Sequence, residues 1–138
     1  MIMSKQCLDV QQMQHLQELG LKLKPSLIHY YKIINIDSGK WYLSVTTGDI
    51  SEDSPTYQYI PAYTLQDVLD ALPTTILHDK QIYELDINMC NERIEYVKTS
   101  VDDVLVGLCF TQLLLIDAAY SMLCWAIENK FVETNKNE

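Results

Sequence analysis

The chain of 138 residues is poor in the residues that build phosphate-binding loops and nucleic-acid surfaces. It holds four glycines, and none lies in a Gly-x-Gly-x-x-Gly or Walker pattern, whose backbone would cradle a phosphate. Arg93 is the only arginine, the lysines are scattered, and the net charge is −9. Because clustered Lys and Arg supply most of the affinity for phosphates, this composition disfavours direct nucleic-acid binding.

The sequence also lacks the spacings of metal sites and of common catalytic motifs. Its cysteines form no Cys-x-x-Cys pair, and its histidines fall on different expected elements. There is no Gly-x-Ser-x-Gly or His-Glu-x-x-His motif. Cys124 has no basic neighbour in the sequence to lower its pKa. We therefore predict no catalytic residue, no metal site and no cofactor, and we interpret the cysteines as packed free thiols.

Length and composition favour one folded unit. Hydrophobic residues make up 48% and charged residues 21% of the chain, which is ordinary globular composition. We predict a single domain over 1–138 with a frayed tail at about 132–138. Residues 1–6 lack the basic start and apolar run of a signal peptide. A cytoplasmic location is expected, where thiols stay reduced.

The first half predicts a helix followed by a hairpin. Asp9 and Gln12 have the spacing of a capping box, which predicts a helix over about 10–19 that ends at Gly20. Residues 28–36 are rich in β-branched and aromatic side chains, and residues 41–46 alternate. The turn-forming sequence between them predicts a β-hairpin.

The second half repeats that order. Thr64 and Asp67 predict the start of a helix over 65–72, which Pro73 ends. Residues 82–89 alternate, and Asn91 and Glu92 can turn the chain into a return strand. These residues predict a second β-hairpin.

The apolar segment 104–127 carries one formal charge, Asp117. The favoured interpretation is one long helix from about 101 to 129, because apolar residues recur at helical spacing. The alternative is a buried strand over 104–110 and a shorter helix over about 112–129. Gly107 and the β-branched residues beside it support that alternative.

The same segment is long enough to span a bilayer, which needs about 20 apolar residues. Asp117 near its middle would cost roughly 2.5–3.5 kcal/mol there, and neither end carries a basic cluster. A core element is therefore the favoured interpretation, and no membrane association is predicted. Together the elements predict an α+β fold of order α-ββ-α-ββ-α: two β-hairpins in an antiparallel or mixed sheet, helices packed on one face, and a long apolar C-terminal helix.

Two surfaces are candidates for binding. Asp117, Ser121 and Glu128 share one helical line, a narrow polar stripe with apolar flanks that include Trp125. This candidate interaction surface would contact a protein partner or a second copy, as a homodimer. The nine tyrosines offer a further recognition patch around residues 57–63, although strand packing explains them too.

The other candidate is an acidic face. Glu84 and Asp86 point out from one expected strand and Glu95 from its partner, with Arg93 or Lys98 as possible counter-charges. Three interpretations of these carboxylates stay open. In the first they form a solvated surface, and in the second they mimic nucleic acid together with Glu92, Asp67 and Asp70. In the third, two of them act as a pair in hydrolysis.

Three stretches, residues 9–20, 60–73 and 117–129, resemble a group of small uncharacterised proteins encoded in bacterial prophages and other mobile elements. The resemblance implies a cytoplasmic phage-type protein and assigns no functional residue. In such proteins the final helix begins near residue 115, which supports the strand alternative for 104–110. We therefore predict a non-catalytic accessory protein that acts by protein–protein interaction. The alternatives are an acidic nucleic-acid-mimic inhibitor and a small carboxylate-dependent hydrolase.

Overall fold

The computed structural model describes residues 5–24, 27–34, 39–45, 56–98, 106–111 and 114–134. Their elements are, in chain order, α1 (Val10–Glu18), β1 (Ile28–Ile33), β2 (Tyr42–Val45), β3 (Tyr57–Pro61), α2 (Leu65–Ala71), β4 (Thr75–His78), β5 (Gln81–Asn88), β6 (Arg93–Lys98), β7 (Val106–Thr111) and α3 (Leu115–Glu128). The predicted α+β class and the predicted alternation of helices with hairpins are confirmed, and β3, β4 and β7 add strands to the two hairpins.

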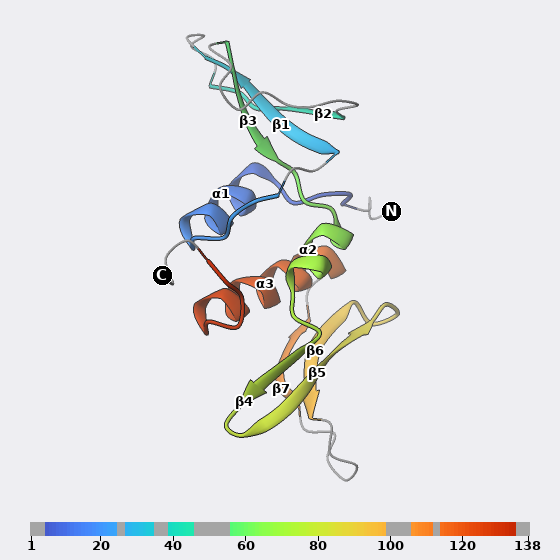
Figure 1. The fold of residues 1–138 in the computed structure, drawn as a ribbon. Coiled ribbons are helices and arrows are strands. Elements are labelled where there is room, and N and C mark those ends of the chain that lie inside the picture. Colours follow the sequence, from blue (N-terminus) through green and yellow to red (C-terminus); the bar gives the residue numbers. More distant parts are fainter. Residues whose placement is uncertain are drawn as a thin grey trace.

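The strands form two antiparallel sheets. The N-terminal sheet has the order β2-β1-β3, and the C-terminal sheet has the order β4-β5-β6-β7. The two sheets lie at opposite ends of the molecule, and the three helices lie between them (Figure 1). Each sheet therefore packs one face toward the helices and turns its other face outward.

Helices α1 and α2 begin at the two predicted capping boxes. The Asp9 carboxylate accepts a hydrogen bond from the Gln12 backbone N–H at 2.8 Å, and Gln12 Oε1 accepts one from the Asp9 N–H at 3.0 Å. Thr64 and Asp67 make the same reciprocal pair at the start of α2. Each box satisfies backbone donors that the first helical turn leaves unpaired.

Both predicted hairpins are confirmed, as β1–β2 and β5–β6. In the β5–β6 turn the Asn91 N–H donates to the Asn88 side chain at 3.1 Å. The hairpin between β4 and β5 was not predicted. Its two turn residues, Asp79 and Lys80, both have positive φ, 51° and 66°, as a two-residue turn that matches strand twist requires. Because the two turn residues are neither glycine nor asparagine, the sequence gives no clear signal for this turn.

The favoured prediction of one long helix from about 101 to 129 is wrong. Residues Val106–Thr111 are strand β7, which pairs with β6, and α3 begins at Leu115. A continuous apolar run has no period that separates a strand from a buried helix, and Gly107 beside β-branched residues favours the strand. β7 also provides hydrogen-bond partners for the second edge of β6. The predicted helix start at 100–105 lies outside the described residues.

One hydrophobic core joins the helices to both sheets. Eight of the 14 residues of α3 are buried, among them Ala118, Ala119 and Met122 with no exposed surface. Small alanine side chains let neighbouring elements approach this helix closely. On the side of the C-terminal sheet, Tyr96 packs against Trp125 with ring centroids 6.2 Å apart. Among the described residues, no helix is long and apolar enough to cross a membrane.

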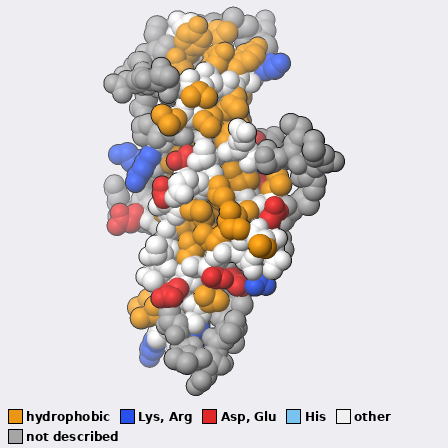
Figure 2. Space-filling model, turned by 90° about the vertical axis from the view of Figure 1, so that its right-hand side faces the viewer, with side chains coloured by type: hydrophobic (Ala, Val, Ile, Leu, Met, Phe, Trp, Pro, Cys, Tyr) orange, Lys and Arg blue, Asp and Glu red, His pale blue; other side chains and the backbone are white. Residues whose placement is uncertain are grey.

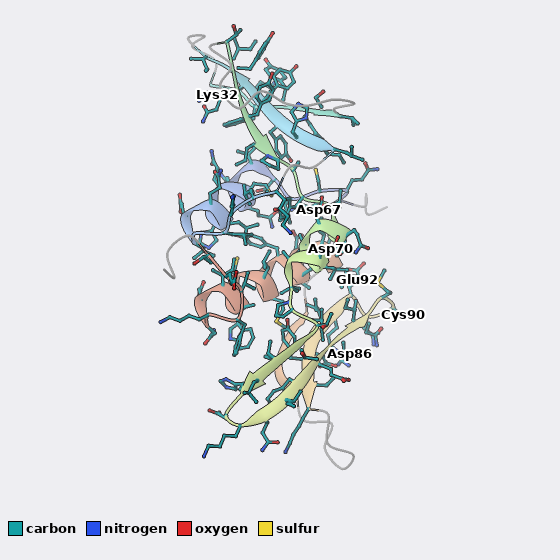
Figure 3. The ribbon with its side chains drawn as sticks, viewed as in Figure 1. Lys32, Asp67, Asp70, Asp86, Cys90 and Glu92 are labelled. Carbon is teal, nitrogen blue, oxygen red and sulfur yellow. The ribbon has the colours of Figure 1, made fainter. Side chains whose placement is uncertain are left out.

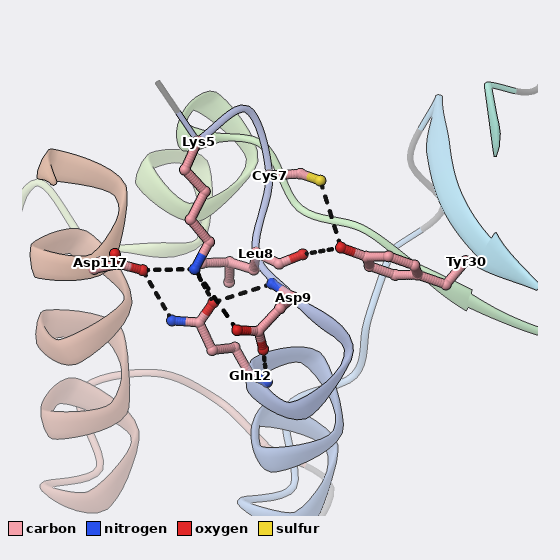
Figure 4. A network of polar contacts seen from close by, with 7 residues as sticks. All are labelled: Lys5, Cys7, Leu8, Asp9, Gln12, Tyr30 and Asp117. Atoms are coloured by element: carbon pink, nitrogen blue, oxygen red, sulfur yellow. Dashed lines mark hydrogen bonds and ion pairs between the residues drawn. The ribbon is translucent and has the colours of Figure 1, made fainter. Parts of the chain in front are cut away.

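A polar contact fixes α1 against α3 (Figure 4). Asp117 Oδ1 accepts hydrogen bonds from Lys5 Nζ at 2.8 Å and from Gln12 Nε2 at 3.0 Å, and Lys5 also donates to Gln12 Oε1 at 2.7 Å. Burial alone would raise the pKa of Asp117, but the hydrogen bonds from Lys5 and Gln12 and the charge of Lys5 outweigh it and lower that pKa. Gln12 thus serves the cap of α1 and the contact with α3 together.

Replacing Lys5→Met should lower the free energy of unfolding by about 1–2 kcal/mol, because Asp117 loses a charged partner at a partly buried position. A lowered pKa contributes stability above the ordinary value of 3.8, and that contribution disappears as the pH falls through the lowered pKa. The free energies of unfolding from urea denaturation of the two proteins should therefore differ at neutral pH and converge only as the pH falls below 3.8 through the lowered pKa of Asp117. Lys80→Met, at an exposed turn, is the matched control and should change stability little. An equal effect of both variants would contradict the role of this contact.

Candidate interaction surface

The outer face of the N-terminal sheet gathers four tyrosines and a histidine from three strands. We call this set, Tyr31, Tyr42, Tyr57, Tyr59 and His29, the tyrosine face. Tyr31 on the central strand has Tyr42 as its partner on one side and Tyr59 on the other. Residues that face each other across antiparallel strands share one face of the sheet, and the alternation along each strand adds His29 and Tyr57 to that face.

The rings of this face form one connected cluster. Tyr31 and Tyr42 stack with centroids 5.4 Å apart, and Tyr31 meets Tyr57 edge to face at 5.9 Å. Tyr57 contacts Tyr59 at 6.1 Å, and Tyr59 contacts His29 at 5.5 Å. Such arrangements are favourable beyond the burial of ring area. These contacts fix the positions of the rings relative to one another.

The tyrosine face is partly open to solvent. Tyr42 and Tyr57 are each 38% exposed, while His29 is 6% exposed. Burial lowers the pKa of His29 below its ordinary value of 6.5, so its imidazole is uncharged at neutral pH. Lys40 Nζ lies 5.5 Å from the centroid of the Tyr42 ring. Figure 2 shows hydrophobic side chains gathered over this end of the molecule.

The opposite face of the same sheet anchors it to the helices. The Tyr30 hydroxyl donates to the Leu8 carbonyl at 2.8 Å, beside Cys7 Sγ at 3.7 Å (Figure 4). Burial is the largest cause of a raised pKa of Tyr30, and the contact with Cys7 adds to it. Tyr63 is buried, and its hydroxyl accepts a hydrogen bond from the Lys24 N–H at 2.8 Å.

The sequence pointed to Tyr57, Tyr59 and Tyr63 as a possible recognition patch. The structure brings Tyr57 and Tyr59 together on the outer face and buries Tyr63. Sequence reasoning missed Tyr31 and Tyr42. Alternating aromatic residues within individual strands are the signal that points to this face. That alternation does not show that strand 57–61 pairs with strand 28–33, so it does not bring these residues together.

The candidate surface on α3 differs from the expected open stripe. Asp117 is bound by Lys5 and Gln12 within the chain, and Trp125 packs between Tyr96 and Phe131. Ser121 is partly exposed and Glu128 is exposed. Two of the four predicted residues therefore have intramolecular partners, and the apolar flanks of the helix are covered by the core.

The candidate acidic face is also divided. Asp86 and Glu95 are direct cross-strand partners, and Glu84 lies two residues before Asp86 on the same exposed side. Glu95, expected at a solvated surface, is only 3% exposed. Its Oε1 lies 3.4 Å from Arg93 Nη2, which confirms Arg93 as a counter-charge. This ion pair offsets the repulsion that two facing carboxylates produce.

The remaining acidic residues of the mimic hypothesis come from other elements. Asp67 and Asp70 lie on α2, and Glu92 lies in the turn between β5 and β6 (Figure 3). The residues with carboxylates are thus distributed over a helix, a turn and a sheet.

A metal centre would need several histidine, cysteine or acidic side chains close together in the part of the chain that the structure describes. No three His, Cys, Asp or Glu side chains come together there as metal ligands would. Burial raises the pKa of Cys124, which keeps its thiol protonated and unreactive at neutral pH.

Comparisons of this chain with protein-family models, with curated proteins and with solved structures give no match. The tyrosine face is therefore the feature of the molecule from which function can be inferred.

The lowered pKa of His29 predicts a pH-dependent stability. Protonation is easier in the unfolded chain than in the folded one, so stability falls as the pH drops below about 6.5. Each pH unit by which the pKa is lowered is worth about 1.4 kcal/mol. His29→Gln should flatten this part of the stability profile measured by urea denaturation. His78→Gln, at an exposed site, should leave the stability profile as in the parent protein. A profile that His78→Gln flattens and His29→Gln does not would show that His29 is not the cause of the pH dependence.

Proposed function

We propose that the chain is a non-catalytic protein-binding module and that the tyrosine face is its contact surface. The observation that carries this proposal is the connected, partly exposed cluster of Tyr31, Tyr42, Tyr57 and Tyr59 on a sheet face that turns away from the helices. Large contiguous apolar patches on a protein surface commonly mark binding sites.

Tyrosine suits such a surface for physical reasons. Its ring gives a large contact area, its hydroxyl gives a hydrogen bond, and only two torsions must be ordered on binding. Tyrosine is accordingly enriched among the residues that dominate binding energy in interfaces. Here mutual ring contacts already order Tyr31 and Tyr57, which reduces the entropy lost when a partner binds.

Aromatic faces of sheets also stack nucleic-acid bases, and they do so beside a basic groove that tracks the phosphates. The cation at this face is Lys40, and the chain as a whole carries −9. Long-range repulsion of phosphates therefore favours a protein partner. The same field attracts a partner with a positive surface, and a guanidinium group of that partner can stack on an exposed tyrosine ring.

The other functions that the sequence suggests have less support from the geometry. An acidic mimic needs an open array, but Glu95 is buried against Arg93. A hydrolase needs two available carboxylates, and the same ion pair engages one of the facing pair Asp86 and Glu95. The phage-type origin and the cytoplasmic location remain predictions from the sequence.

The double variant Tyr42→Ser/Tyr57→Ser tests the proposal. Both side chains are exposed enough that folding should survive, within about 1 kcal/mol. Protein captured from a lysate by the immobilised parent chain is identified and purified, and its affinity is measured by calorimetry for each variant. The affinity should fall about tenfold or more for the double variant and should weaken with added salt.

Leu77→Ser/Met89→Ser is the matched control, because it removes two side chains of 67% and 65% exposure from the C-terminal sheet and its turn. The control should bind as the parent does. Equal affinities of the tyrosine variant and the parent would refute the proposed surface, and recovery of nucleic acid in place of protein would refute the partner class.

A further inference from the structure

Four rings of the tyrosine face close into a cycle, which we call the ring cycle. Tyr31 contacts Tyr57 with ring centroids 5.9 Å apart, and Tyr57 contacts Tyr59 at 6.1 Å. His29 completes the circuit, with its ring 5.5 Å from that of Tyr59 and 6.4 Å from that of Tyr31. The planes of Tyr31 and Tyr57 stand at 83°, and those of His29 and Tyr59 stand at 67°. The four rings are therefore arranged as walls around a common centre and not as one stack.

Strand pairing brings these rings together. Tyr31 on β1 and Tyr59 on β3 are direct cross-strand partners. His29 lies two residues before Tyr31, and Tyr57 lies two residues before Tyr59, so both side chains share the face of that pair. Because the strands are antiparallel, His29 and Tyr57 lie at opposite ends of the pair. One register of two strands thus supplies all four rings.

The ring cycle has an exposed side and a buried side. Tyr57 is 38% exposed, Tyr31 and Tyr59 are partly exposed, and His29 is 6% exposed. Tyr42 on β2 stacks against Tyr31 at 5.4 Å, on the side of β1 that lies away from β3. A group that enters beside Tyr57 would therefore meet several rings and lose contact with water toward His29.

The centre of the ring cycle suits a positive charge. A cation is attracted to the face of an aromatic ring when it lies within about 6 Å of the ring centroid. Ring contacts of 5.5–6.4 Å place the centre of the cycle within about that distance of every ring. Rings at the start of β2 already attract cations of the chain itself. Lys40 Nζ lies 5.5 Å from the centroid of the Tyr42 ring, and Lys32 Nζ lies 5.8 Å from that of Trp41.

The charge of the surroundings agrees with a cationic ligand. Burial lowers the pKa of His29, so its imidazole is uncharged at neutral pH and does not repel a cation. The net charge of the chain, −9, attracts a cation from solution.

Hydration and shape narrow the identity of this cation. Lysine carries a strongly hydrated ammonium group with three N–H donors, which find no acceptor at a ring face. Arginine carries a planar guanidinium group, which stacks on a single ring. A quaternary ammonium group has no N–H and spreads its charge over methyl groups. Several rings can therefore surround it at a low desolvation cost, and aromatic cages recognise such groups.

We propose that the ring cycle is a binding site for a quaternary ammonium group. The partner carries this group as the side chain of a trimethylated lysine, a step that rests on the proposed function because it takes the partner to be a protein. The ring site itself does not depend on that step, because free choline has the same trimethylammonium head group.

Calorimetric titration of the full chain with choline and with dimethylbutanol tests the site. Dimethylbutanol is the neutral analogue of choline in which a carbon atom replaces the charged nitrogen. Choline should bind, and the neutral analogue should bind about tenfold or more weakly, because it lacks the charge that the ring faces attract. Equal affinities, or no binding of choline at millimolar concentrations, would overturn the proposal without any variant that could misfold.

Substitutions at Tyr57 separate a cation site from a packing role. Tyr57→Phe keeps the aromatic face and should retain choline binding, whereas Tyr57→Leu keeps apolar bulk without that face and should weaken binding about tenfold. Tyr120→Leu, at a partly exposed tyrosine of α3, is the matched control and should bind choline as the parent does. A loss of binding in both Tyr57 variants, or in Tyr120→Leu, would contradict a cation site at the ring cycle.

Trimethyllysine and lysine, each acetylated and amidated at the backbone, test the source of the group. Trimethyllysine should bind as choline does, and lysine should bind about tenfold or more weakly. Binding of choline without binding of trimethyllysine would overturn the protein source and leave the ring site in place. If choline does not bind and Tyr42→Ser/Tyr57→Ser still weakens binding of the captured protein, the ring site is overturned and the proposed contact surface stands.

Discussion

Burial of the apolar surface of α3 is the constraint on which the rest of this structure depends. Its eight buried side chains leave little of the helix for water, so the chain must surround it. The four-stranded sheet covers one side, α2 covers another, and the Lys5–Gln12–Asp117 contact holds α1 beside it. Exposing this surface would cost about 25 cal/mol for each Å². A helical layer in the middle of the molecule follows from that need.

This central layer explains why each sheet has one face that points away from the helices. Each sheet packs one face toward the helices, and no further element in the described chain covers the other (Figure 1). The two outer faces then differ in chemistry. One carries tyrosine rings, and the other carries Glu84, Asp86 and the ion pair between the partly exposed Arg93 and the buried Glu95. The C-terminal sheet thus uses charge within the chain, whereas the described rings of the N-terminal sheet contact one another.

Features that depend on neighbouring residues could be predicted from the sequence. The caps at Asp9 and Thr64 and the hairpins β1–β2 and β5–β6 follow from side chains and turns a few residues apart. Features that depend on distant partners could not. The hydrogen bond between Lys5 and Asp117 joins residues 112 apart in sequence. The tyrosine face needs the register of three strands, and no single one of those strands reveals it. β7 was misassigned because its continuous run of apolar residues lacks the alternation that would mark a strand.

The combination of a negative chain and a neutral contact surface has a physical consequence for recognition. Net charge acts over about a Debye length, roughly 8–10 Å in physiological salt, and accelerates the approach of a positive partner. At the contact itself, burying tyrosine rings avoids the desolvation cost of burying ionised groups. Steering and contact energy therefore come from different parts of the molecule.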